Sequence, residues 1–354
     1  MDKKIKIGII GTRGIPNNYG GFERFIELFV KEHNLNSPIS IVIYGEKNTS
    51  NHNGKNYSYV SQFFSKKNGI LYYFEAALRS SFRCDVIFCC GVGISFSAII
   101  PKIFNRKLII NPDGCEWKRK KWSKFGRILL KLIFYPVLKI ADKIIVDSEA
   151  LKDDFGNSFS QKYIYIPYQI PDAVIADSCK IKKFGFDKYL LEKKSFFLVI
   201  SRLEPEQNIS MICESFLRSN STSELIIVGK TDTKYYKNEL NKYHNNSISF
   251  LGGIYDQSIL NFFRSNCKLY IHGHTVGGTN PSLIEALNVC NKRIACFQTK
   301  YNFEVARNNA QYFKDQQSLT KIMNSNEYSA LEQWNDDRFL PRKIYDDYME
   351  TFLN

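Results

Sequence analysis

The sequence predicts an α/β protein made of two doubly wound, Rossmann-like domains, each a parallel sheet with helices on both faces. Short β-branched runs alternate with helical patterns along the chain, which is typical of βαβ units. The alternation starts afresh after a polar stretch near the middle, and 354 residues leave room for two cores of about 150 residues each. We expect a first domain over residues 1–170, a linker over 171–193, a second domain over 194–335, and a C-terminal helix over 336–354 that is a candidate to pack back on the first domain.

The expected strands include continuous apolar runs such as "KIGII" and "DVIFCC", which suit strands buried on both faces of a sheet. In the first domain they lie near residues 4–10, 39–44, 85–90, 107–111, 143–147 and 162–166. In the second domain they lie near residues 195–201, 224–229, 247–252, 268–273 and 292–297. Because ligands of doubly wound folds bind outside the carboxyl ends of the strands, we expect the site in a central cleft that both sheets face.

Positive charge is concentrated in the first half of the chain. Residues 1–170 hold 26 Lys and Arg against 14 Asp and Glu, which is +12 of the +14 net charge of the whole chain. Such a surface indicates an anionic partner, namely a membrane surface, a phosphorylated lipid or a nucleic acid. A basic face that is merely solvated is the alternative.

Neither a membrane span nor a secretion signal is expected. The nearest apolar candidate, residues 128–146, is interrupted by Lys131, Lys139, Asp142 and Lys143, and the first residues of the chain suit a β-strand. The nine cysteines include no C-x-x-C and no Cys/His spacing typical of zinc, so we expect buried free thiols and no metal. The chain is therefore predicted to be cytosolic.

The segment "KLYIHGHTVGGTNPSLIEALNV" (268–289) predicts a nucleotide site. Asn280 is a good N-cap, and Pro281 suits the first position of a helix. The glycines before them let backbone amides approach a ligand, and a helix start presents unpaired N–H groups, which together suit a phosphate. Glu285, one turn further on, is placed to accept hydrogen bonds from a ribose diol. An ordinary β–α turn is the alternative.

A single arginine follows the first strand of the second domain. In "ISRLEPEQN" (200–208), Arg202 stands where that strand ends. Its guanidinium could point into the cleft and pair with a diphosphate. An arginine at such a place is more often a surface ion-pair partner. The diphosphate interpretation of Arg202 therefore depends on the Gly-rich loop.

A rival interpretation is a nicotinamide-dependent oxidoreductase or a nucleotide-sugar epimerase. Three glycines at G-x-x-G-x-x-G spacing begin the segment "GIIGTRGIPNNYGGFERF" (8–25). Two further features support this alternative. They are Glu46 near the end of the second strand, and the Y-x-x-x-K spacing of Tyr189 and Lys193. Against it, Pro16 and the polar residues that follow insert a long loop where the dinucleotide fingerprint needs a helix at once. The second α/β domain would also have no role.

Acidic residues and a basic aromatic run follow the strand at 107–111. Asp113 and Glu116 lie where a general base or an acceptor for sugar hydroxyls would be useful. The next residues combine two tryptophans with five cations and lead into an amphipathic helix. They are Trp117, Lys118, Arg119, Lys120, Lys121, Trp122 and Lys124. This pattern is typical of a membrane-interface surface, and also of a nucleic-acid patch or of a helix that packs on the sheet.

Five segments together resemble the rhamnosyltransferase-type subgroup of retaining glycosyltransferase family four, whose members build bacterial capsule and O-antigen repeat units. They are "IGTRGIPNNYGGFERF", "NPDGCEWKRKKWSKF", "ADKIIVDSEALKDDF", "SRLEPEQNI" and "HGHTVGGTNPSLIEAL". The resemblance implies a GT-B fold and a retaining, metal-independent hexosyltransferase that needs no cofactor beyond its nucleotide-sugar co-substrate. The C-terminal domain would hold a dTDP- or UDP-linked sugar, with dTDP-rhamnose as the first candidate. The N-terminal domain would meet a polyprenyl-diphosphate-linked saccharide at the inner face of the cell membrane, and no nucleic acid.

The resemblance also implies roles for individual residues. Arg202 would neutralise the donor diphosphate, and Glu285 would bind the ribose. The loop residues that would touch phosphate and sugar are Gly277, Gly278, Thr279 and Asn280. The acceptor-side residues would be Arg13, Gly20, Gly21 and Glu116. Asp113 would share the catalytic centre with Arg202 and would orient a sugar hydroxyl or support the cationic transition state.

Three positions depart from the family pattern. The first glutamate of the family's Glu-seven-residues-Glu motif falls at Gly277, so one contact to the donor sugar is missing. The basic residue usual five positions after the arginine is Gln207, and the usual active-site histidine is replaced by Asp113. These departures leave the identity of the transferred sugar open.

Overall fold

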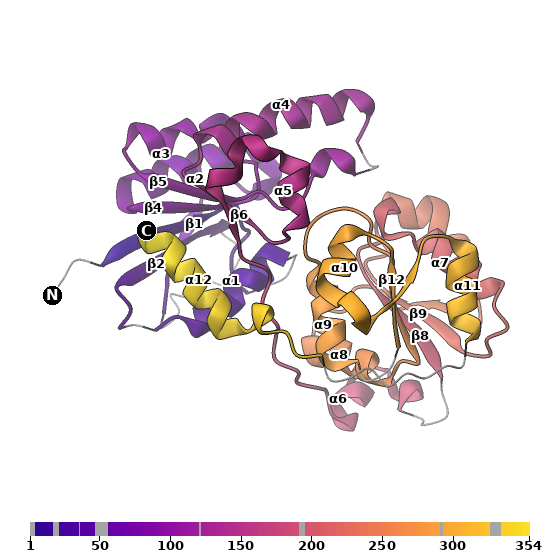
Figure 1. Cartoon of the computed structure of the whole chain (residues 1–354). Helices are drawn as coiled ribbons and strands as arrows, with labels where there is room; N and C mark the ends of the chain where they lie inside the picture. The colour runs from indigo at the N-terminus through magenta and orange to yellow at the C-terminus, as the bar shows by residue number, and fades with distance from the viewer. Residues whose placement is uncertain are drawn as a thin grey trace. The chain divides into compact units, whose positions relative to one another are not determined.

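The computed structural model of the chain describes residues 4–16, 21–34, 36–46, 56–119, 122–190, 195–290, 293–325 and 334–354. The chain divides into two compact units, each built around its own sheet (Figure 1). The first unit contains Met1–Gln169, Gly277–Thr279 and Asp337–Asn354, and the second contains Ile170–Val276 and Asn280–Asp336. Within the described ranges, every helix is too short or too polar to span a bilayer.

The first unit is a parallel sheet in the order β3-β2-β1-β4-β5-β6-β7. Its strands are β1 (Ile5–Ile10), β2 (Ile39–Glu46), β3 (Ser58–Gln62), β4 (Val86–Cys90), β5 (Lys107–Asn111), β6 (Lys143–Val146) and β7 (Tyr163–Tyr165). In the centre of the sheet, Ile7 of β1 is paired with Ile41 on one side and Val86 on the other. Every residue of β4 is buried, which explains its unbroken apolar sequence.

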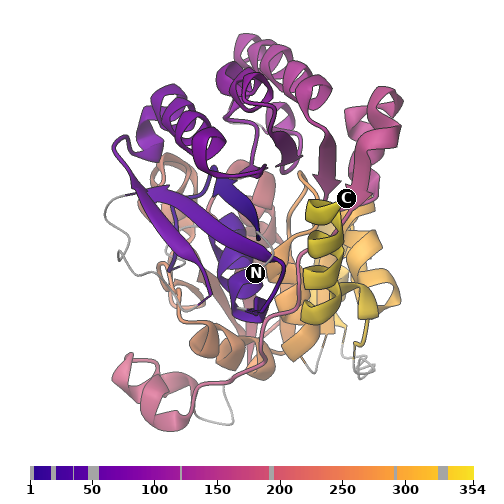
Figure 2. The same cartoon turned by 90° about the vertical axis from the view of Figure 1, so that its left-hand side faces the viewer.

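The helices of the first unit are α1 (Gly21–Glu32), α2 (Gly69–Arg83), α3 (Ile99–Ile103), α4 (Lys124–Ile140), α5 (Ala150–Phe155) and α12 (Pro341–Leu353). The last of these, drawn in yellow in Figures 1 and 2, packs on α1 through aromatic rings. The ring centroids of Phe25 and Tyr348 are 4.8 Å apart, and those of Phe29 and Tyr345 are 5.2 Å apart. Aromatic packing therefore holds the end of the chain on the first unit.

The second unit is a parallel sheet in the order β10-β9-β8-β11-β12-β13. Its strands are β8 (Phe196–Ile200), β9 (Glu224–Val228), β10 (Ile248–Phe250), β11 (Leu269–His272), β12 (Arg293–Phe297) and β13 (Gln311–Phe313). Its helices are α6 (Ser178–Lys183), α7 (Ile209–Leu217), α8 (Gln257–Asn266), α9 (Pro281–Val289), α10 (Lys300–Ala306) and α11 (Gln316–Asn324). Ile209, Ile212 and Phe216 recur at helical spacing along α7 and join the same buried cluster as Leu225 and Ile227 of β9.

These sheets confirm the predicted α/β class, and each expected strand is present. The sequence does not predict β3 and β13, because both are short strands at a sheet edge and β3 is mostly only partly buried. The segment expected as a linker also differs from the prediction. Its residues 178–190 fold onto the second unit, where Ile181 and Tyr189 are buried.

The strand order reverses between β1 and β4 in the first sheet, and between β8 and β11 in the second. In doubly wound sheets the loops at the carboxyl ends of these two strands diverge and leave a crevice for ligands. The loops after β8 and β11 are therefore the first place to look for a site in the second unit.

Candidate active site

Helix α9 begins as the sequence predicts. The Asn280 side chain accepts a hydrogen bond from the Ser282 backbone N–H (3.0 Å), and Pro281 occupies the first helical position. In the preceding loop, Gly277 has a φ of 115°, a left-handed conformation that favours glycine. A helix start with this kind of loop before it suits the binding of an anion.

Within the second unit, the loops that follow β8 and β11 are hydrogen-bonded to each other. Thr275 donates from its backbone N and from Oγ1 to Glu206 O (3.1 and 2.9 Å), and Asn208 Nδ2 donates to Gly273 O (2.9 Å). A Cβ at Gly273 would lie 2.1 Å from a backbone oxygen of the opposing loop, so only glycine permits this approach. The loop that carries Arg202 therefore lies beside the segment that leads into the Gly-rich loop.

Arg202 is exposed and makes no ion pair or side-chain hydrogen bond with the residues that the structure describes. Gln207 is instead buried, and its Nε2 lies 2.5 Å from His274 Nδ1. Of these two side chains, Arg202 alone is placed to meet a ligand in solvent. The loop thus presents one exposed cation, and its role at a diphosphate stays a prediction.

A buried histidine ends β11. Burial lowers the pKa of His272 to about 3, so its ring is neutral at physiological pH. Its Nε2 has no hydrogen-bond partner among the described residues, and its ring stacks on that of Tyr270 (centroids 6.5 Å apart). Protonating this ring inside the unit would cost folding free energy.

We expect His272→Phe to remove part of the acid sensitivity of the fold. The native pKa lies below the unfolded value of 6.5, so the stability from the neutral ring is complete above pH 6.5 and is lost as the pH falls towards about 3. Between pH 6.5 and pH 5, the wild type should lose about 2 kcal/mol of unfolding free energy that the variant keeps. Urea titrations at both pH values measure the difference, and equal losses in the two proteins would contradict the prediction.

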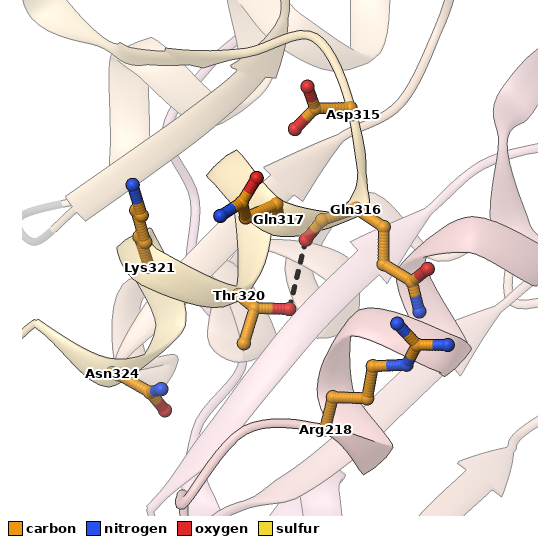
Figure 3. A pocket seen from close by; sticks show the side chains of 7 residues that line it. All are labelled: Arg218, Asp315, Gln316, Gln317, Thr320, Lys321 and Asn324. Atoms are coloured by element: carbon orange, nitrogen blue, oxygen red, sulfur yellow. Dashed lines mark hydrogen bonds between the residues drawn. The ribbon is translucent and has the colours of Figure 1, made fainter.

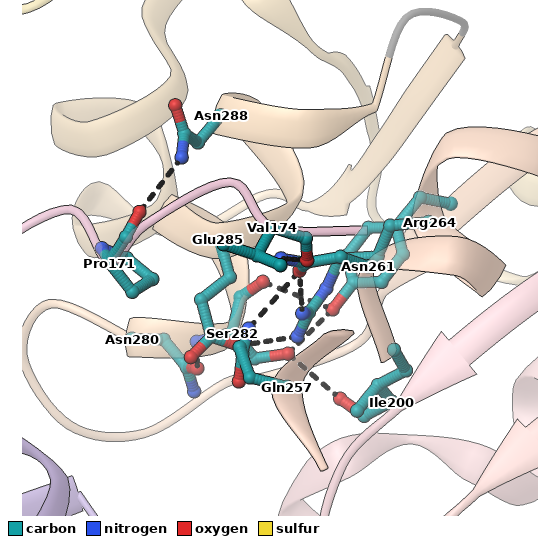
Figure 4. Close-up of polar contacts among 11 residues, drawn as sticks. Pro171, Val174, Ile200, Gln257, Asn261, Arg264, Asn280, Ser282, Glu285 and Asn288 are labelled. Carbon is teal, nitrogen blue, oxygen red and sulfur yellow. Dashed lines mark hydrogen bonds and ion pairs between the residues drawn. The ribbon is translucent and has the colours of Figure 1, made fainter. Parts of the chain in front are cut away.

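The carboxylate of Glu285 is already held by an arginine (Figure 4). Its Oε2 accepts a hydrogen bond from Nη2 of Arg264, with which it forms an ion pair. The Arg264 side chain is fully buried, whereas 12% of the Glu285 side chain is exposed. The structure gives Oε1 of Glu285 no hydrogen bond from a described residue. One carboxylate oxygen is thus fixed, and the other remains available for a ligand.

A polar row on α8 supports this ion pair. Gln257, Asn261 and Arg264 recur at i, i+4 and i+7, so they share one face of the helix. Gln257 Nε2 and Arg264 Nη1 both donate to Asn261 Oδ1 (3.1 and 3.0 Å), and Asn261 Nδ2 donates to Val174 O (3.0 Å). Asn288 of α9 donates to a backbone oxygen of the same segment (3.1 Å). Residues 171–176 therefore run along both helices.

In the first unit, a buried carboxylate organises the loop after β1. Glu23, in the first turn of α1, accepts hydrogen bonds at Oε1 from Thr12 Oγ1 (3.2 Å) and the Arg13 backbone N (2.8 Å). Gly21 is the first residue of α1, and Gly20 lies outside the described residues. Glu23 is not among the predicted site residues, although an acidic residue in a first helical turn is a usable signal.

Asp113 stands in the loop after β5. Its φ is 63°, its backbone N donates to Asn111 Oδ1 (3.0 Å), and its side chain is 47% exposed. Arg119 Nη2 lies 3.8 Å from Asp113 Oδ2. The side chain of Asn111, at the end of β5, thus holds the backbone of Asp113 in a conformation that is uncommon for a non-glycine residue. This places Asp113 at the carboxyl edge of the first sheet.

Both carboxylate oxygens of Glu116, which the sequence predicts on the acceptor side, bind side chains of its own loop. Arg119 Nε lies 2.6 Å from Glu116 Oε2, and Trp122 Nε1 donates to Glu116 Oε1 (3.1 Å). Arg119 is buried as a result, so it is not one of the exposed cations of the predicted membrane patch. The pairing of the planar guanidinium with the Glu116 carboxylate explains why Arg119 is buried and not exposed.

Trp117 also differs from the prediction. It is buried, and its ring lies 4.4 Å from that of Phe134 in α4, so it belongs to the core of the first unit. Lys118 is exposed and pairs with Asp154 (2.6 Å). Lys120 and Lys121 lie outside the described residues, and Trp122 and Lys124 are exposed. The exposed part of the predicted patch is therefore smaller than the sequence indicated.

Helix α4 leaves an apolar stripe in solvent. Phe125, Ile128 and Leu132, at i, i+3 and i+7, are 76%, 58% and 67% exposed. Three exposed lysines lie along the same helix: Lys124, Lys131 and Lys139. An amphipathic helix with its apolar side exposed and cations beside it is the arrangement found in interfacial helices.

The dinucleotide alternative finds no support in the geometry. Helix α1 starts at Gly21, well beyond the third glycine of the spacing at Gly14. Tyr189 is buried, with its ring 5.3 Å from that of Phe263, and Lys193 lies outside the described residues. A tyrosine that packs in an aromatic cluster is not placed for hydride-transfer chemistry.

A hollow of about 470 Å³ lies elsewhere on the second unit (Figure 3). Its lining residues are Arg218, Asp315, Gln316, Gln317, Thr320, Lys321 and Asn324. None of the predicted site residues is among them, and Asp315 already caps α11 together with Ser318.

The described residues also bring no three His, Cys, Asp or Glu side chains together in a way that could hold a metal ion.

Family models match both units. Residues 181–326 match the model described as glycosyl transferases group 1, and residues 4–70 and 85–171 match a domain of unknown function, DUF1972. No curated protein matches the chain at a significant level.

Solved structures share the fold over nearly the whole chain. The chain is similar to Anabaena Alr3699/HepE in complex with UDP-glucose, with 16% identity, a TM-score of 0.74 and 99% coverage of both chains. It is also similar to the sucrose-phosphate synthase of Thermosynechococcus elongatus (12% identity, TM-score 0.70, 99% of this chain and 94% of that one). A UDP-forming trehalose-phosphate synthase from Burkholderia xenovorans, in complex with glucose-6-phosphate, has 10% identity, a TM-score of 0.71 and coverage of 99% and 100%.

Fold and family together define the class of protein. The chain has the GT-B fold of glycosyltransferases, as the sequence predicts. Its second unit is a group 1 glycosyltransferase domain, which makes the protein a glycosyltransferase, and its first unit carries the DUF1972 domain.

Proposed function

We propose that this glycosyltransferase transfers a hexose, with retention and without a metal, from a nucleotide-sugar to a polyprenyl-diphosphate-linked saccharide in bacterial surface polysaccharide synthesis. One observation carries the proposal. Within the group 1 domain, the Arg202 loop is hydrogen-bonded to the segment that leads into the Gly-rich loop before α9. This arrangement supports a role for the exposed Arg202 guanidinium in binding an anion there. The UDP-glucose complex of the Anabaena structure supports a nucleotide-sugar donor. dTDP-rhamnose is our first candidate and a UDP-sugar the second.

The reaction follows from these groups. In a retaining transfer the acceptor hydroxyl attacks the anomeric carbon on the face that the leaving diphosphate vacates. Arg202 and the positive end of the α9 dipole stabilise the charge that develops on the diphosphate. The leaving phosphate takes the proton of the acceptor hydroxyl. Asp113 orients a sugar hydroxyl or stabilises positive charge on the sugar ring.

Calorimetric titration with dTDP, UDP, GDP and NADH in parallel tests the donor class. We expect micromolar binding of one nucleoside diphosphate and none of NADH. Binding of NADH alone would return the oxidoreductase alternative, and binding of no nucleotide would contradict the proposed donor site.

The ribose role of Glu285 predicts a specific loss of nucleotide affinity. We expect Glu285→Gln to weaken binding of the preferred nucleoside diphosphate by about tenfold, because neutral acceptors form weaker hydrogen bonds than a carboxylate. The isosteric amide still accepts a hydrogen bond from Arg264, but the buried guanidinium loses its counter-charge, so the variant should be less stable than the wild type. Calorimetry measures the affinity, with Glu239→Gln, an exposed glutamate of the same unit, as the control. Unchanged affinity in Glu285→Gln would remove the ribose role.

Peripheral membrane association completes the proposal. The excess positive charge of the first 170 residues and the exposed apolar stripe of α4 both support a surface that meets anionic lipid. An acceptor with a polyprenyl chain would be presented at such a surface.

A further inference from the structure

Arg264 is an unusual residue for the place it occupies. It is fully buried on α8, directly after Phe262 and Phe263, which are themselves buried. Removing a charge from water costs several kcal/mol even when it is paired, and an apolar residue of similar size is often as stable. The ion pair with Glu285 therefore needs an explanation other than stability.

The Arg264 guanidinium is fixed at two points. Nη2 donates to Glu285 Oε2, and Nη1 donates to Asn261 Oδ1 (3.0 Å). Asn261 is fixed in turn, because its amide group also binds Gln257 Nε2 (3.1 Å) and Val174 O (3.0 Å). Since the fork of an arginine is planar and rigid, fixing one arm sets the direction of the other.

The backbone that carries Glu285 is fixed independently. One turn before it, Ser282 Oγ donates to Ile200 O (3.1 Å) and lies 2.7 Å from Tyr270 Oη. One turn after it, Asn288 Nδ2 donates to Pro171 O (3.1 Å). With both neighbouring turns of α9 held, rotation of the Glu285 side chain is the freedom that remains. The bond from Arg264 removes it, as the convergence of the two side chains in Figure 4 shows.

We propose that Arg264 is a positioning residue that sets the Glu285 carboxylate for the ribose of the donor nucleotide. The inference rests on the proposed ribose role of Glu285. Arg264 occupies Oε2 from the buried side, which leaves Oε1 to accept from a sugar hydroxyl. A carboxylate fixed in this way loses less conformational entropy when the nucleotide binds, which raises the affinity. The gain requires the sugar hydroxyls that bind the carboxylate, and it does not involve the diphosphate.

The test is a ratio of affinities that a general weakening of the fold does not change. For each protein, calorimetry measures the Kd of two deoxy analogues and of their parent nucleotides. The first ratio is the Kd of 2′,3′-dideoxy-UDP divided by the Kd of UDP. The second ratio is the Kd of 3′-deoxythymidine diphosphate divided by the Kd of dTDP. The larger of the two ratios is followed. We expect it to be about tenfold or more in the wild type, because it reports hydrogen bonds between sugar hydroxyls and a carboxylate. In Arg264→Gln it should fall to near one, while the Kd of the deoxy analogue stays the same.

Arg293→Gln is the matched control. Arg293 is also buried in the second unit, but it donates to Gln311 Oε1 (2.8 Å) and to the backbone oxygens of Ser325 and Ile322. Its substitution should leave the ratio at the wild-type value. If Arg264→Gln does not fold, Arg264→Lys serves in its place: an ammonium lacks the planar fork that joins Glu285 to Asn261, so the ratio should still fall severalfold.

The outcomes separate this inference from the function on which it rests. A ratio that stays at the wild-type value in Arg264→Gln or Arg264→Lys, but collapses in Glu285→Gln, would overturn the positioning role and leave Glu285 on the ribose. A ratio near one already in the wild type would overturn both. A collapse in Arg293→Gln as well would show that any buried change in this unit lowers the ratio, and would also overturn the inference.

Discussion

Arg202→Ala should lower kcat for sugar transfer by about 10²–10³-fold, in line with the loss of one preorganised electrostatic donor at a developing negative charge. The residue follows β8 at the switch point of the second sheet, it is exposed, and no described residue forms an ion pair with it. Its charge is therefore uncompensated in the free protein and available to a diphosphate. Steady-state turnover with the donor identified by nucleotide titration measures the effect.

Arg218→Ala is the control for this prediction. Arg218 is an exposed arginine of the same unit that lines the hollow beside α11, away from the loops after β8 and β11. Its removal changes the net charge by the same amount and should leave kcat within about twofold, as expected for a surface substitution. Near-normal turnover of Arg202→Ala would show that the diphosphate is held elsewhere, and the donor assignment would be wrong.

Local sequence rules predicted the parts of the site that are built from neighbouring residues. Asn280 and Pro281 form the cap and first position of α9 because the chemistry of a helix start involves only a few adjacent residues. The buried strands were also readable, because β4 and β8 are covered on both faces and consist almost wholly of apolar residues. Arg202 could be placed at a strand end for the same reason.

Contacts between distant residues could not be predicted in this way. The pairing of Arg264 with Glu285 spans 21 positions and joins two helices, and neither residue has a local pattern that marks it as half of a buried pair. Trp117 and Arg119 looked like exposed members of a basic patch. Trp117 is buried against Phe134 of α4, which is a distant contact, whereas Arg119 pairs with Glu116 only three positions away. Amphipathic residues such as Trp and Arg suit either environment, so composition alone leaves the choice open.

Replacing Lys124, Lys131 and Lys139 of α4 with Ser should weaken binding to anionic vesicles by about 100-fold, since each cation near such a surface contributes about 1 kcal/mol. Arg119 and Lys118 are left unchanged, because Arg119 is buried and Lys118 is paired with Asp154. Co-sedimentation with mixed phosphatidylcholine and phosphatidylglycerol vesicles measures the effect. The binding should also weaken as salt is raised, because exposed charges are screened.

Two further variants separate charge from apolar contact. Lys234, Lys237 and Lys242 are exposed on the second unit, so their replacement with Ser removes the same charge and should leave sedimentation close to the wild-type level. Phe125→Ser with Leu132→Ser keeps every cation of α4 but removes two exposed apolar side chains, and should weaken binding to anionic vesicles at high salt, where electrostatic attraction is small. If the three lysine changes in α4 and those in the second unit weaken binding equally, net charge alone attracts the protein. In that case α4 is not the surface that meets the membrane.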